Sequence, residues 1–164
     1  MRSNQWQWAL EYISLGLDID KDNVILLNQK TVCHGRLGDF SSAIGSCKKV
    51  IELLQEPTEK LAATINLLEF LALNNQPIEF ANIYTTNKTV IDQHNSGNTS
   101  AYMNALNLLI NGDFQQAVNG LDAFAKINPQ NEPIKYLDSW GFDEALVTSH
   151  YPQVAAARIK SANG

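Results

Sequence analysis

The side chains that most often carry chemistry are few in this sequence and widely spaced. The three histidines, His34, His94 and His150, form no HExxH pair or other metal-ligand spacing, so we expect no metal site and no cofactor. Cys33 precedes His34, but adjacent residues on a helix point about 100° apart and cannot form a thiol–imidazole pair. The pattern therefore predicts a protein that is not an enzyme.

Sequence motifs for covalent or phosphate chemistry are also missing. The chain has no GxSxG, no phosphate-binding loop and no GxGxxG after an expected strand. Cys33 and Cys47 are 14 residues apart and are expected on the two helices of one hairpin. This spacing leaves a disulfide open but favours two thiols packed as small apolar side chains.

Composition narrows the class of partner. The 164 residues are 45% hydrophobic and carry a net charge of −5 without a basic block, which argues against nucleic-acid or anionic-membrane binding. No apolar run is long enough to span a membrane, and no signal-peptide pattern precedes Asp18. We expect a cytoplasmic protein if the chain is complete. The location is undetermined if the chain is a fragment of an exported or membrane-anchored protein.

The helical elements that would position any site are clearest in residues 98–131. Apolar residues recur there at helical spacing on both sides of Asn111-Gly112-Asp113. Gly112 provides the left-handed conformation that ends a helix, Asp113 can cap the next helix, and Pro129 ends it. Such a hairpin cannot bury its apolar face alone, so it predicts neighbouring hairpins.

A related spacing occurs earlier in the chain. Gly38, Phe40 and Ala43 repeat the order glycine, aromatic, alanine of Gly112, Phe114 and Ala117, and Ala9 lies 34 residues before Ala43. The sequence resembles the tetratricopeptide repeat (TPR) family, whose unit is a helix-turn-helix of about 34 residues. The resemblance covers most of the chain but is degenerate, with departures at three positions: Thr31, Ala101 and Phe124.

The resemblance implies an all-α fold, an α-α superhelix in which TPR-like hairpins form a right-handed solenoid. We predict one domain over residues 1–164. Within it the expected parts are the second helix of an incomplete repeat (1–21), a repeat (22–57), a degenerate repeat (58–97), a repeat (98–131) and a compressed repeat with a capping helix (132–164). Expected helix starts include caps at Asp39 or Ser41 and at Thr58, and Pro77 in a first turn.

The family's first helices line a concave groove that holds a peptide. Carried over by spacing, the groove residues would be Asn28, Val32, Arg36, Asn66, Phe70, Tyr102, Leu106 and Asn107. Asparagines could hold a peptide backbone and the larger apolar groups could accept side chains. That Phe70 and Leu106 are instead buried between helices is an open alternative. The near absence of lysine from this set predicts against a terminal-carboxylate ligand.

The resemblance therefore implies a non-catalytic module that binds a protein or peptide partner. By analogy it suggests a scaffold or assembly factor, such as the small TPR proteins of bacterial secretion or pilus systems.

The first helix, expected over residues 5–18, suggests a second surface. Its apolar face lacks a partner helix, so Trp6, Trp8 and Ile13 could form a homodimer or end interface. Alternatives are a fragment or subunit of a larger repeat protein with a structural role, or a helix that caps its own fold.

Overall fold

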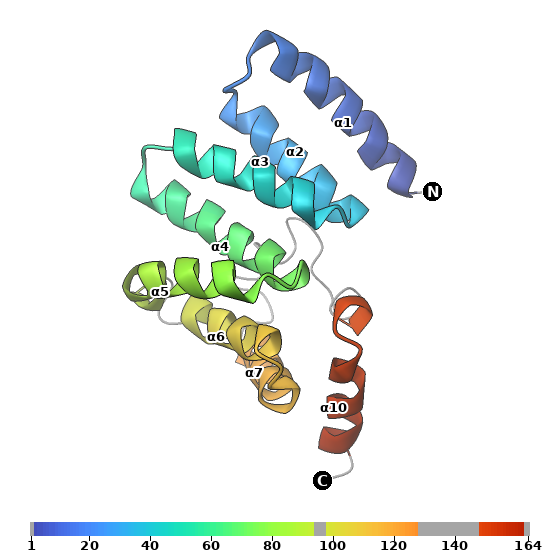
Figure 1. Ribbon diagram of the computed structural model, residues 1–164, viewed down its shortest axis with the longest axis vertical. Helices are drawn as coiled ribbons and strands as arrows, with labels where there is room; N and C mark the ends of the chain where they lie inside the picture. Colours follow the sequence, from blue (N-terminus) through green and yellow to red (C-terminus); the bar gives the residue numbers. More distant parts are fainter. Residues whose placement is uncertain (1, 94–97, 128–147, 163–164) are drawn as a thin grey trace. The chain divides into compact units, whose positions relative to one another are not determined.

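The computed structural model describes residues 2–93, 98–127 and 148–162, and within these ranges the chain is helical and contains no strand (Figure 1). The predicted all-α class is confirmed for this part of the chain. The helices are α1 (Arg2–Ile19), α2 (Val24–Leu37), α3 (Phe40–Leu53), α4 (Pro57–Leu73), α5 (Pro77–Gln93), α6 (Asn98–Ile110), α7 (Phe114–Ile127) and α10 (Gln153–Ala162).

The described residues form two compact units, and the division falls within α4. Residues 2–70 belong to the first unit, and the described residues from Leu71 onward belong to the second. The prediction of a single domain over residues 1–164 stays a prediction.

In the first unit, α2 contacts both α1 and α3. A core formed by Leu27, Val50 and Ala63 joins α2, α3 and α4. The Cys47 thiol on α3 donates a hydrogen bond to the Ala63 carbonyl of α4, with 3.2 Å between sulfur and oxygen. Burial of these apolar groups is the main force that holds the unit together.

In the second unit, α6 contacts α5 and α7, and α10 contacts α7. Tyr151, just before α10, packs on Phe114 with 6.3 Å between ring centroids, and its hydroxyl donates to the Ala72 carbonyl. Burial raises the pKa of Tyr151 to about 12, so the hydroxyl keeps its proton. Val154 and Ala157 turn inward from α10. A helix is therefore present where the C-terminal capping helix is expected, and it is anchored to the second unit.

Three turns share one geometry and recur at a fixed interval. Gly38, Asn75 and Gly112 all have positive φ, at 77°, 50° and 85°, and they are 37 residues apart. At each turn the amide of this residue donates to the carbonyl three residues back, and the next amide donates to the carbonyl five residues back. This is the Schellman arrangement, which satisfies the last carbonyls of a helix.

The helices that follow these turns begin in the same register. The fifth residue after each turn residue is Ala43, Phe80 or Ala117, and all three are fully buried. Counting by 37 residues in either direction reaches Trp6 on α1 and the buried Val154 on α10. By this register α1 corresponds to α3 and α5, the second helices of their helix-turn-helix segments.

The interval between these turns is longer than the 34-residue unit of the TPR family. The turns recur every 37 residues, and Phe80 takes the position that Ala43 and Ala117 take in the other two segments. The middle turn hid this register because it uses Asn75 where the others use glycine.

The predicted helix starts are mostly confirmed. Asp39 and Asp113 accept hydrogen bonds from the amides of Ser42 and Gln116, and α5 begins at Pro77. The cap at Thr58 is wrong because α4 already begins at Pro57. The compressed repeat expected within residues 132–164 lies mostly outside the described residues, which resume only at residue 148.

Candidate functional site

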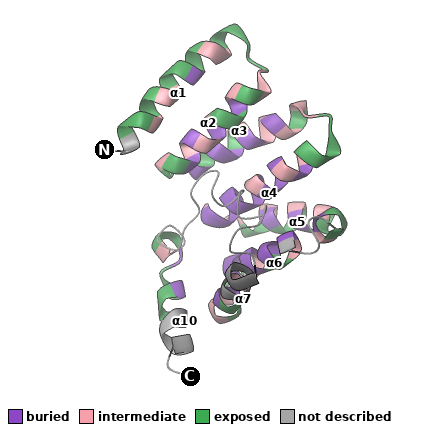
Figure 2. Ribbon diagram, turned by 180° about the vertical axis from the view of Figure 1, so that it is seen from behind, coloured by how far each residue is buried: buried purple, intermediate pink, exposed green. Residues whose placement is uncertain are grey.

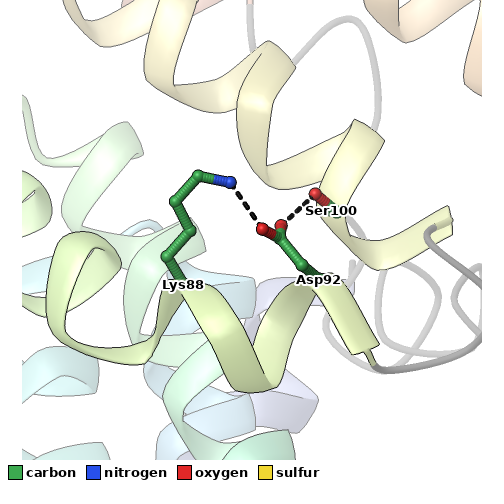
Figure 3. A network of polar contacts seen from close by, with 3 residues as sticks. All are labelled: Lys88, Asp92 and Ser100. Carbon is green, nitrogen blue, oxygen red and sulfur yellow. Dashed lines mark hydrogen bonds and ion pairs between the residues drawn. The ribbon is translucent and has the colours of Figure 1, made fainter.

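A cluster of Lys88, Asp92 and Ser100 at the α5–α6 contact most resembles catalytic groups (Figure 3). Lys88 Nζ lies 2.6 Å from Asp92 Oδ2, and the Ser100 hydroxyl donates to the other carboxylate oxygen. The Lys88 ammonium also lies 5.8 Å from the centre of the Tyr84 ring. The cluster joins α5 to α6 across residues 94–97.

The protonation states of this cluster fit a structural link better than catalysis. Hydrogen bonds from Lys88 and Ser100 lower the pKa of Asp92, and its carboxylate in turn raises the pKa of Lys88. Both groups therefore stay charged at neutral pH, and the serine proton faces a weak base. A nucleophilic serine needs a base with a pKa near neutrality.

The residues around His34 are packed rather than reactive. His34 Nδ1 lies 3.3 Å from Asp39 Oδ2, and burial lowers the pKa of the imidazole. Burial raises the pKa of the Cys33 thiol and raises that of Cys47 to about 12. Both cysteines are buried and unpaired, as expected for thiols that pack as small apolar groups. A thiol with a raised pKa is a poor nucleophile at neutral pH.

Within the described ranges, no group of three or more His, Cys, Asp or Glu side chains could hold a metal ion. The helices described there are also too short or too polar to cross a lipid bilayer.

In the first unit, the predicted groove residues do not share one exposed surface. Asn28 and Arg36 are exposed, Val32 is half-buried, and the Arg36 guanidinium lies 5.7 Å from the centre of the Trp6 ring. The side-chain oxygen of Asn66 is buried. Phe70 is fully buried and stacks on Phe40 with 6.3 Å between ring centroids. Of the two positions left open for Phe70, the buried one is therefore the one observed, and its ring is not exposed to a peptide.

In the second unit, Tyr102 and Leu106 are also buried, so neither is exposed to a peptide. For Leu106 this is the alternative that the sequence leaves open. Asn107 is half-buried, and its side-chain oxygen accepts a hydrogen bond from Asn111 at 3.1 Å. α6 turns these apolar positions toward the core, because it has helical neighbours on two sides. The larger apolar residues expected to line the groove are instead buried inside the two units.

The residues predicted to form an interface on α1 lie on two different faces of the helix. Ile13 is buried, and Trp6 is half-buried beneath Arg36, so neither offers a free surface. Gly16 lies against Leu26 of α2 on the same side, where an added Cβ would come within 2.6 Å of Leu26 Cδ1. Trp8 is 62% exposed and points elsewhere. The prediction for Ile13 is corrected because that residue packs on the protein's own core.

A second apolar row on α1 was missed by sequence reasoning. Trp8, Tyr12, Leu15 and Ile19 are spaced by four, three and four residues and are 62%, 76%, 62% and 90% exposed. At 100° per residue, the middle of this row lies roughly 130° around the helix from the buried Ile13. We call these four residues the outward face of α1, which is largely exposed along its length (Figure 2). Their spacing is the signal that could have revealed them.

Comparison with known proteins gave no match: no protein-family model matches the chain, no curated protein matches it, and no solved structure matches it.

Proposed function

We propose that the protein is a non-catalytic protein-interaction module of TPR-like helical hairpins, and that it binds its partner through the outward face of α1. The observation that supports this most directly is the exposed row of Trp8, Tyr12, Leu15 and Ile19. Contiguous apolar surface of this kind is unfavourable in water, and it commonly marks a protein-binding site. Tryptophan and tyrosine are also among the residues that contribute most to protein interfaces.

The corresponding faces of α3 and α5 show that the row is particular to α1. In the 37-residue register, the four positions are Gly45, Lys49, Glu52 and Glu56 after the first interval, and Asn82, Thr86, Thr89 and Gln93 after the second. Seven of these eight residues are exposed, including Glu56 just beyond the end of α3, and Lys49 is half-buried in an ion pair with Asp22. The face that is polar on α3 and α5 is therefore apolar on α1.

The recurring turns support the repeated helix-turn-helix segments that the TPR resemblance implies, although their interval is longer than that of the family. The groove expected from that resemblance has less support, because Phe70, Tyr102 and Leu106 are buried. We therefore place partner binding on α1, and keep Asn28 and Arg36 as polar groups that a partner could also contact.

The proposal predicts a selective loss of partner binding in Leu15→Glu. The matched control is Ile78→Glu, which places the same charge at a 79% exposed isoleucine on α5. Affinity capture from the source cells, quantified by mass spectrometry, should yield proteins that are retained by wild type and Ile78→Glu and lost with Leu15→Glu. Identical captured sets for all three would argue against the outward face as a binding surface.

A further inference from the structure

We infer that the outward face of α1 takes an amphipathic helix whose apolar row is bordered by lysine or arginine. This inference rests on the proposed function and names the chemistry of the partner. The four exposed residues follow the alternating four-three spacing of coiled-coil contact positions over about three helical turns. A straight row of this kind fits the side-chain ridge of another helix better than it fits an extended peptide.

The helix that we infer on the outward face does not pack on α1 in the way that the first helix of a hairpin packs on the second. α3 contacts α2 on one side and α4 on another, whereas among the described helices α1 has its main contact with α2. On α3, Ile44 is buried and Ile51 is half-buried, but the corresponding positions on α1 are Gln7 and Ser14, which are exposed and polar. If another helix packed on α1 in the way that α2 packs on α3, it would contact these polar residues. The outward face would then remain exposed.

The charges along the outward face favour a basic partner over a second copy of the chain. Glu11 and Asp18 are exposed along one edge of the row, and residues 4–19 contain no lysine or arginine. Two copies paired antiparallel through this face would place their Glu11 and Asp18 carboxylates along the same edge, where they repel. A helix with lysine or arginine at that edge would instead form complementary pairs.

The test uses two synthetic helical peptides that carry leucines at the spacing of the outward face, one with lysines beside that row and one with glutamates. Their affinities for the full chain are measured by titration calorimetry at low and moderate salt. We expect the lysine peptide to bind more tightly, with a preference that shrinks as salt screens the charges. Leu15→Glu should weaken its binding by about thirtyfold or more, whereas Ile78→Glu should not change it.

Reversing the charge of the two acidic residues isolates the electrostatic contribution to peptide binding. In a Glu11→Lys, Asp18→Lys double variant, the lysine peptide should bind about fivefold or more weakly and the glutamate peptide more tightly, because each exposed pair contributes modestly. Far-UV circular dichroism and urea unfolding of each variant confirm that the fold is retained. This is expected because Leu15, Glu11 and Asp18 are all exposed.

The outcomes separate this inference from the proposed function. If both peptides bind equally, or if the double variant leaves both affinities unchanged, the inference of a basic partner is wrong. The outward face would still be a binding surface. A wild-type dimer in light scattering that Leu15→Glu converts to a monomer would overturn it in favour of a second copy. If Leu15→Glu changes neither peptide binding nor oligomeric state, both the inference and the proposed function are wrong.

Discussion

α1 and α4 both carry apolar residues around most of their circumference, but they use this surface differently. On α4, Leu68 and Phe70 are fully buried, and so are most of the other apolar residues. The ribbon of α4 is accordingly buried along most of its length (Figure 2). On α1, one side packs on α2 while Leu15 and Ile19 face solvent. The comparison shows that apolar content alone does not distinguish a core helix from a helix that offers a binding face. The distinction depends on which neighbours are present.

The largest expected effect tests whether the two helices differ in their contribution to stability. Phe70→Ala removes a fully buried ring that stacks on Phe40, so it should lower the free energy of unfolding by about 3–5 kcal/mol. Tyr12→Ala removes an exposed ring and should change it by no more than about 0.5 kcal/mol. Urea unfolding followed by circular dichroism measures both. Similar losses for the two variants would remove the distinction between α1 and α4.

A smaller effect tests the turn register by which α1 is aligned with α3. Gly38 has φ of 77°, so Gly38→Ala should destabilise the protein by about 1–2 kcal/mol. Gly45 lies on the α3 face that corresponds to Trp8, and a Cβ there meets no atom within 4 Å. Gly45→Ala should therefore stabilise the protein by about 0.5–1 kcal/mol. The two thermal unfolding midpoints should move in opposite directions, and a shift of both in one direction would contradict the assigned register.

The smallest effect is a pH dependence that should separate folding from binding. Burial lowers the pKa of His34 below its ordinary value of 6.5, although Asp39 partly opposes this. The folded state therefore binds fewer protons, and stability should fall as the pH drops through 6.5. His34→Gln should reduce the pH dependence of the thermal unfolding midpoint, measured between about pH 7.5 and 5.5. Residues 4–19 contain no histidine, so binding of the lysine peptide should vary little over this range.

Much of the helical architecture could be predicted from local sequence signals. Two turns can be recognised from the sequence, because glycine and capping aspartate have direct conformational roles there: Gly38 with Asp39, and Gly112 with Asp113. The third turn was obscured by Asn75, which adopts the same left-handed conformation without the glycine signature. The 37-residue register therefore became visible only in the backbone.

The candidate site was harder to predict because spacing does not tell which apolar row on a helix is covered. Phe70, Tyr102 and Leu106 fit a groove by spacing alone, but neighbouring residues bury them. On α1, the spacing favours the row containing Ile13 because it matches one face of an amphipathic helix, and the same prediction includes Trp8. The second row, which includes Leu15, becomes informative only once α2 is known to occupy the opposite side.

The central claim, that the outward face of α1 is a docking surface, is tested most directly by the solvent exposure of Trp8. A Trp6→Phe, Trp140→Phe variant retains Trp8 as its only tryptophan, and acrylamide quenching then reports on that side chain. In the free protein the quenching should be strong, since Trp8 is 62% exposed, and saturating lysine peptide should reduce it severalfold. Quenching that is unchanged when the peptide is bound would show that binding occurs elsewhere and would contradict the claim.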